Sequence, residues 1–136
     1  MISAEDYFSD KRSKANDDHE ENAAELLHRV NMLLADYHQT TGRILPLNPK
    51  TGTLVSGNKN GDGGFRLPNS LTGSAKSSHK EAKAVDIYDP LNLLDKFITD
   101  NTLRMFDLYR EAPASTPRWV HLSTRKPGSG MRTFNP

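Results

Sequence analysis

The chain has 136 residues, a net charge of +1 and no cysteine. The length fits one domain, 1–136, and the near-zero charge gives no reason to expect a nucleic-acid partner. The lack of cysteine excludes disulfides, thiolate metal sites and a cysteine nucleophile. No stretch approaches the roughly 20 apolar residues that span a bilayer. Residues 1–10 lack the basic start and apolar run of a signal peptide. We therefore expect a soluble chain made in the cytoplasm, with no membrane insertion.

The first third of the chain predicts one long helix. Residues 1–20 are charged and mostly polar, and we expect a loose arm that docks through Tyr7 and Phe8. From Ala23 to Thr41, apolar residues recur at i, i+1, i+4, i+7, i+8 and i+11, which draws one apolar stripe along a helix. Gly42 is placed to end this helix.

The remainder predicts short strands and helices. Segments 53–55 and 64–67 are candidate strands, and 84–88 and 119–123 are clearer ones. Asp89-Pro90 reads as the N-cap and first position of a helix whose apolar face includes Leu91, Leu94, Phe97 and Ile98. A further helical segment holds Leu103, Phe106 and Leu108. Because the elements do not alternate as βαβ units, we expect an α+β fold with a small antiparallel sheet and flanking helices.

Two predicted strands each carry one polar residue between aliphatic neighbours, Asp86 in 84–88 and His121 in 119–123. Side chains alternate between the two faces of a strand. The aliphatic neighbours therefore point to one face, and Asp86 and His121 to the other, where they meet if the strands are adjacent. His79 lies seven residues before Asp86, across a loop long enough to fold back over the same face.

Two imidazoles and one carboxylate leave room for a water molecule on a bound metal. That ligand set suits a catalytic zinc site, in which the pKa of the bound water falls to about 7. The same ligands could hold non-haem Fe(II). The usual oxygenase spacing places the carboxylate two residues after the first histidine, whereas the gap here is seven. The spacing therefore favours zinc over iron.

Three segments carry a family resemblance. Residues 77–86, SSHKEAKAVD, resemble the Ser-x-His-x-x-Gly-x-Ala-x-Asp motif of the zinc D-alanyl-D-alanine carboxypeptidase and L-alanyl-D-glutamate endopeptidase family, which includes many phage endolysins. Residues 119–121, WVH, resemble its Trp-x-His, and residues 64–66, GFR, its Gly-Tyr/Phe-Arg element. The segments occur in the family's order, and the resemblance covers roughly residues 54–136. It implies a Hedgehog/DD-peptidase-like fold.

The resemblance also implies roles for individual residues. Arg66 would bind a substrate carboxylate or carbonyl, or a developing oxyanion, because its planar fork suits such oxygens. Ser77 would hydrogen-bond near the ligand loop or touch the substrate, and Trp119 would pack at the edge of the site. The zinc ligands would be His79, Asp86 and His121.

The sequence departs from the family pattern at two positions. Ala82 replaces the motif's glycine, a mild change unless the position needs a positive φ. Arg118 stands where many members place a catalytic acid, and it cannot act as a base at neutral pH. The reaction still needs a group to move a proton from water to the leaving amine. We expect Glu111, the nearest upstream acid, in that role, with Asp107 as the reserve.

The expected activity is amide hydrolysis in the stem peptide of bacterial peptidoglycan, of the D,D-carboxypeptidase or the L-alanyl-D-glutamate endopeptidase type. A short chain of this kind without a signal peptide fits a phage or prophage lysin, released by a holin or carried in the particle. Two alternatives stay open. One is a catalytically impaired zinc-containing module that binds wall peptides or serves as a structural part of a virion. The other is a non-haem iron oxygenase.

Overall fold

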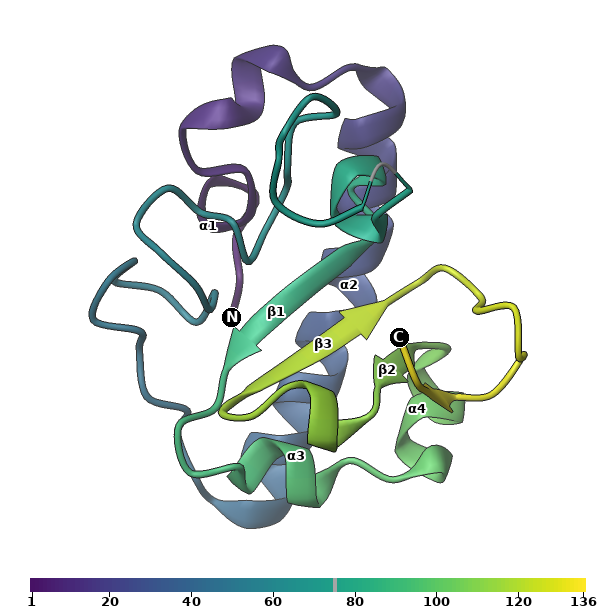
Figure 1. Ribbon diagram of the computed structural model, residues 1–136. Helices are drawn as coiled ribbons and strands as arrows, with labels where there is room; N and C mark the ends of the chain where they lie inside the picture. The colour runs from purple at the N-terminus through teal and green to yellow at the C-terminus, as the bar shows by residue number, and fades with distance from the viewer. Residues whose placement is uncertain (75) are drawn as a thin grey trace.

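The computed structural model describes residues 1–74 and 76–136 and shows an α+β fold, as predicted. Its four-stranded sheet has the order β1-β3-β2-β4, and the long helix α2 crosses behind β1 and β3 (Figure 1). The strands are β1 (Ala84–Tyr88), β2 (Tyr109–Glu111), β3 (Trp119–Ser123) and β4 (Thr133–Phe134).

The expected purely antiparallel sheet is wrong in one respect. β1, β3 and β2 pair antiparallel, but β4 runs parallel to β2. Residues 124–132 carry the chain from the end of β3 round to the free edge of β2, so the last strand enters the sheet in the direction of β2. The sheet is therefore mixed.

The expected loose arm is wrong, because the N-terminal residues form α1 (Ala4–Phe8) and the 3₁₀ turn η1 (Ser9–Lys14). Its docking through Tyr7 and Phe8 is confirmed, since both rings are buried. The Tyr7 hydroxyl donates to the carbonyl of Ala84 at 2.9 Å. Burial raises the pKa of Tyr7, so this hydroxyl keeps its proton. Burying two aromatic rings outweighs the polar composition of the arm.

Helix α2 (Asp17–Thr41) begins at Asp17 rather than Ala23. Asn16 caps it: its side chain accepts from the backbone N–H of His19, and the His19 ring accepts from the N–H of Asn16. The helix ends at Gly42, with φ 72°, as predicted. The predicted apolar stripe is confirmed as buried, through Leu26, Leu27, Val30, Leu33, Leu34 and Tyr37.

Segments 53–55 and 64–67 do not form the strands expected of them. Only isolated bridges occur near the first, where Val55 pairs with Ile87. This irregular chain nevertheless hydrogen-bonds along the outer edge of β1. The bonds run from the N–H of Tyr88 to Leu54, from Ser56 to Asp86 and from Asp86 to Gly63. Loop backbone therefore covers an edge that would otherwise lie open.

The next predicted helix begins later than expected, as α3 (Leu93–Phe97). Asn92, with φ 57°, is its N-cap, and Pro90 lies outside it. The Asp89 carboxylate still accepts from the N–H groups of Leu94 and Asp95, at 3.1 and 2.9 Å. Asp89 thus satisfies the first-turn donors from a position outside the helix.

Helix α4 (Asp100–Phe106) contains the predicted Leu103 and Phe106, but Leu108 lies beyond its end. Strand β2 follows and was not predicted. Arg110, in its middle, is 8% exposed, and its guanidinium lies 3.1 Å from the Asp95 carboxylate. Two further 3₁₀ turns complete the fold, η2 (Ser78–Glu81) and η3 (Pro113–Ser115).

The sheet has one apolar and one polar face, as the alternation of β1 and β3 predicts. Val85, Ile87, Val120 and Leu122 join the buried stripe of α2 in one core cluster. Asp86 and His121 take the alternate positions and lie on the other face. None of the helices in the described residues has the length and apolarity to cross a membrane.

The docked N-terminal segment makes a prediction about stability. Replacing Tyr7 with alanine removes a buried ring and should lower the free energy of unfolding by about 3–5 kcal/mol, as measured by urea denaturation. Leu71→Ala, at a fully exposed position, is the matched control and should change that free energy by at most about 0.5 kcal/mol. Equal effects of the two substitutions would mean that the segment does not belong to the core.

Candidate metal centre

One row of side chains crosses the sheet from β1 to β2. Asp86 on β1 pairs directly with His121 on β3. The register that pairs Arg110 with Leu122 brings Glu111 to the place opposite His121 on the far side of β3. Opposed residues of antiparallel strands share a face. Glu111 Oε2 accordingly lies 3.7 Å from His121 Nδ1.

His79 reaches this row from η2, which Ser77 caps by accepting the backbone N–H of His79 at 3.3 Å. The His79 Nδ1 atom lies 2.9 Å from the carbonyl oxygen of Gly64. Because a carbonyl only accepts, Nδ1 carries the proton, and Nε2 is the atom that faces Asp86 Oδ1, at 3.2 Å. A backbone carbonyl that fixes a histidine tautomer in this way is the usual support of a metal ligand.

The side chains of His79, Asp86 and His121 converge on one point. His121 Nδ1 lies 2.9 Å from Asp86 Oδ1, and the three ligand atoms all lie within 4.8 Å of one another. The three side chains are at most 13% exposed. This group could hold a metal ion, because two imidazole nitrogens and a carboxylate oxygen form a common ligand set for divalent transition metals.

The carboxylate at the centre of the group stays ionised. Burial acts to raise the pKa of Asp86, but the charge of His79 and the hydrogen bonds from both histidines hold that pKa below its usual range. An ionised carboxylate in a nearly closed site favours a positive partner, either protons on the imidazoles or a cation in their place.

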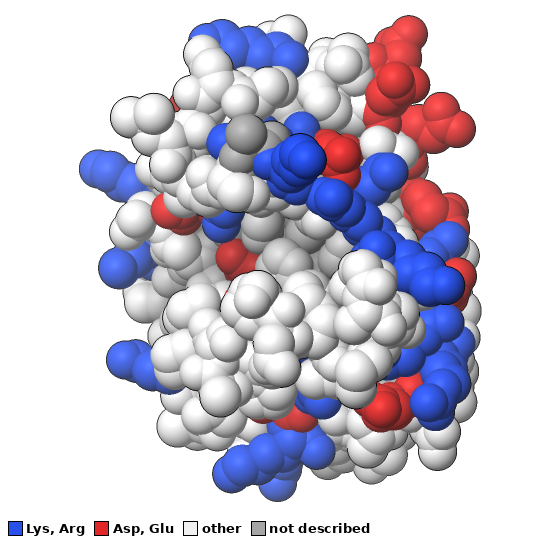
Figure 2. Space-filling model, turned by 45° about the vertical axis from the view of Figure 1, so that its right-hand side comes forward, with Lys and Arg blue, Asp and Glu red and all other residues white. Residues whose placement is uncertain are grey.

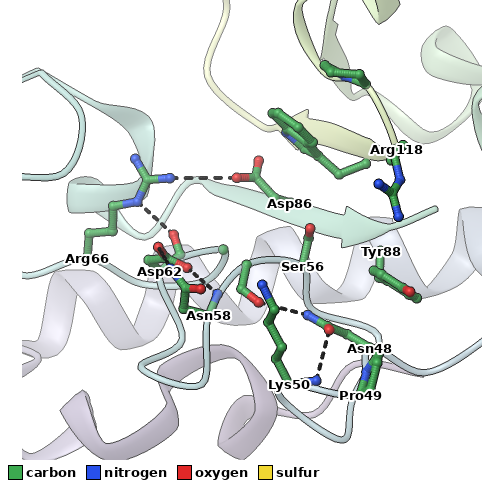
Figure 3. A pocket seen from close by; sticks show the side chains of 14 residues that line it. Asn48, Pro49, Lys50, Ser56, Asn58, Asp62, Arg66, Asp86, Tyr88 and Arg118 are labelled. Carbon is green, nitrogen blue, oxygen red and sulfur yellow. Dashed lines mark hydrogen bonds and ion pairs between the residues drawn. The ribbon is translucent and has the colours of Figure 1, made fainter. Parts of the chain in front are cut away.

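Arg66 is fixed at the rim of the group. Its Nε donates to the carbonyl of Asp62 at 2.7 Å, and Nη2 lies 3.6 Å from Asp86 Oδ2 (Figure 3). Gly73, with φ 78°, lies against the guanidinium, since a Cβ there would fall 2.7 Å from Nη1 of Arg66. The arginine is 15% exposed, and its guanidinium points toward the Asp86 carboxylate (Figure 3).

A cleft of about 540 Å³ opens beside Asp86. The face in Figure 2 is hollowed near its middle, and Lys and Arg side chains gather along its right-hand side. Figure 3 shows that the side chains around the cleft come from separate loops and from the ends of β1 and β3. Its walls include Lys50, Arg66, Tyr88, Arg118 and Trp119.

The other predicted site residues lie in different places. Trp119 is half-buried and lines the cleft. The Ser77 hydroxyl accepts a hydrogen bond from the backbone N–H of His79 and so caps η2, the turn that carries His79. Asp107 does not reach the site: its side chain is 60% exposed and pairs with Arg29 and Arg132, at 3.4 and 2.9 Å. Of the two candidate bases, Glu111 is therefore the one that lies beside His121, and Asp107 points to a different part of the surface.

The two departures from the family pattern have different structural meanings. Ala82 is buried and adopts φ 58°, so the position does need the left-handed conformation, which costs an alanine roughly 1–2 kcal/mol. Arg118 also has a positive φ, 73°, but it is exposed and lines the cleft. Arg118 therefore adds a cation to the wall of the cleft.

Three contributions to the site could not be read from the sequence. Phe134 on β4 pairs with Glu111 in register, and its ring centroid lies 6.1 Å from that of His121. Lys50 enters the cleft from a loop. Gly64 supports His79 through its carbonyl. The GFR motif marked Gly64 in the sequence, but its supporting role is seen only in the fold, where a Cβ on Gly64 would collide with the carbonyl oxygen of Tyr7.

The convergence predicts a specific loss of metal affinity. Replacing His79 with alanine should weaken binding of a probe ion, Zn²⁺, by at least about 100-fold, because two ligands remain where a stable site needs three. Competition with a chromophoric chelator measures the affinity. His28→Ala, on the exposed surface of α2, is the control and should bind as the unmodified chain does. Equal affinities in all three proteins would show that the ion binds elsewhere.

Comparisons with known proteins add no information on what these residues bind or do. No protein-family model, curated protein or solved structure matches the chain. What is established is an α+β domain in which two strands and a 3₁₀ turn bring His79, Asp86 and His121 together as a group that could hold a metal ion.

Proposed function

We propose that this chain is a zinc-dependent peptidase of the Hedgehog/DD-peptidase type that hydrolyses amide bonds in the stem peptide of peptidoglycan. The observation that carries the proposal is the convergence of His79, Asp86 and His121, with Glu111 in the same row. The motif resemblance supports the choice of substrate. The geometry supports a hydrolytic metal site independently of it.

Zinc suits the donor set. Two histidine nitrogens and one carboxylate oxygen are the ligands of many catalytic zinc sites, which keep a fourth position open. Zinc bound by these residues would supply a Lewis acid for the scissile carbonyl and lower the pKa of a water molecule to about 7. The Gly64 carbonyl holds the ring of His79 in the tautomer that such binding needs.

Glu111 moves the proton. Its carboxylate lies 3.7 Å from Nδ1 of His121 and is 20% exposed, so a water molecule beside the metal ligands is within its reach. Glu111 takes a proton as the water oxygen bonds to the carbonyl carbon. It returns that proton to the nitrogen as the C–N bond breaks, which yields a free carboxylate and a free amine.

Arg66 acts on the carbonyl oxygen. Its guanidinium is held by the Asp62 carbonyl and lies on the cleft side of Asp86. As the carbonyl carbon becomes tetrahedral, its oxygen gains negative charge, and a fixed donor stabilises that charge more than the ground state. The guanidinium can do this without reorganising, since its neighbours already fix it.

The cleft chemistry fits an acidic peptide. Stem peptides carry free carboxylates, and the three basic residues that line the cleft, Lys50, Arg66 and Arg118, outnumber its two acidic residues, Asp62 and Asp86. Tyr88 and Trp119 supply apolar surface beside them. Within this proposal the chain acts as a phage or prophage lysin, reaching the wall after holin release or in the particle.

One observation favours a second function. Arg118 occupies the position at which many family members place an acid, and Ala82 strains the turn that carries His79. A protein with these features could bind wall peptides through the same cleft, or serve in a virion, without turnover. Purified walls distinguish the two functions. Release of new amino groups that EDTA stops indicates the peptidase, and wall binding with stoichiometric zinc but no release indicates the module.

The proposed proton transfer predicts a separation of metal binding from turnover. Glu111→Gln should keep its zinc, because Glu111 is not among the ligands, and should lower turnover by about 10²–10⁴-fold. Metal analysis together with mass spectrometry of digested muropeptides measures both, and iron in place of zinc would point to an oxygenase. Asp107→Asn is the control and should keep full turnover. Unchanged turnover in Glu111→Gln would assign the base to another group.

A further inference from the structure

A second, smaller cavity lies on the far side of the metal ligands from the cleft. Its volume is about 180 Å³. The residues that line it come from η2, from the end of β3 and the chain after it, and from β4. They include Ser78, Ser123, Arg125, Lys126 and Phe134.

Strand β3 fixes the order of the two cavities. Trp119, His121 and Ser123 lie at alternate positions and therefore on one face. Trp119 lines the cleft, Ser123 lines the small cavity, and the metal ligand His121 lies between them. At about 3.3 Å per residue the two ends are roughly 13 Å apart, the length of about four residues of extended peptide. A peptide that crosses the metal ligands along β3 reaches both cavities.

Two basic residues and two serines line the small cavity. The guanidinium of Arg125 donates to the Lys76 carbonyl at 2.6 Å and lies 3.5 Å from the Glu81 carboxylate, which offsets part of its charge. Its backbone N–H donates to the hydroxyl of Ser123 at 2.9 Å. That hydroxyl keeps its own proton to donate. Lys126 is an exposed residue that lines the same cavity.

We propose that this cavity is a second substrate subsite, which binds a carboxylate on the opposite side of the scissile bond from the cleft. Lys126 supplies the charge, and Ser78 and Ser123 supply hydroxyl donors. The inference rests on the proposed peptidase function and deepens it. A carboxylate here belongs either to the terminus of the peptide, which makes the enzyme a carboxypeptidase, or to an acidic side chain, which makes it an endopeptidase.

The test uses the zinc-loaded full chain and synthetic stem pentapeptides in three forms: all carboxylates free, only the C-terminal carboxylate amidated, and only the internal carboxylates amidated. Calorimetry on the Glu111→Gln background measures binding, and the chain with Glu111 intact gives KM and kcat. Lys126→Glu should weaken binding of the free form and raise its KM about tenfold, with little change in kcat. Lys126→Arg should stay within about twofold of the unmodified chain.

The control is Lys96→Glu, an equal charge change at an exposed position on α3. Lys96→Glu should leave both the binding affinity and the KM unchanged. If Lys126→Glu no longer weakens binding of the C-terminally amidated peptide, the terminal carboxylate occupies the cavity. If the effect is lost with the internally amidated peptide, an internal carboxylate occupies it. Equal behaviour of Lys126→Glu and Lys96→Glu during normal cleavage would overturn the subsite alone. Binding that depends on Lys126, without cleavage by the unmodified chain, would overturn the peptidase alone. If the unmodified chain neither binds nor cleaves the peptides, both the subsite and the peptidase proposals are overturned.

Discussion

The pairing of β1 with β3 places Asp86 opposite His121, and the rest of the site depends on this register. A slip of one residue would turn Asp86 into the core and an aliphatic side chain onto the polar face. Burying an unpaired carboxylate costs several kcal/mol. Val85 and Leu122 are fully buried against α2 in the observed register. The apolar side of the sheet therefore specifies the geometry of the polar side.

The third ligand is held by a different part of the fold. The Gly64 carbonyl binds the ring of His79, and Gly64 itself is pressed against the backbone of Tyr7. Phe65 donates its N–H to the Tyr7 carbonyl at 3.0 Å, and the Tyr7 hydroxyl bonds to Ala84 at the start of β1. The N-terminal segment thus links the loop that supports His79 to the strand that carries Asp86. Its docking therefore helps to orient His79, a member of the group that could hold a metal ion.

The sequence predicted what depends on local pattern. Period-2 alternation identified the strands of Asp86 and His121, and the helical stripe identified α2. Strand β2 has three residues, too few to show an alternation of apolar and polar side chains. Its buried middle residue is also charged, because Arg110 pairs with Asp95. The docking of Tyr7 and the direction of β4 depend on contacts distant in the chain, which no local window contains. The sequence predicts Glu111 only as the nearest acid upstream of His121, and the register of β2 is what places it in the row.

The charges around Asp86 explain why these groups converge. A carboxylate this enclosed needs a positive neighbour, and Arg66, at 3.6 Å, contacts only its outer oxygen. The inner oxygen faces both histidines, at 3.2 and 2.9 Å. Protons on the imidazoles and a metal ion between them satisfy the same requirement, so the two compete for the same nitrogen atoms. Asp86 and its two imidazole neighbours therefore form a group that could hold a metal ion. Glu111 lies in the next place along the row, with Oε2 3.7 Å from Nδ1 of His121. In the proposed peptidase the metal would take its carboxylate ligand from Asp86, which would leave Glu111 to accept a proton from water.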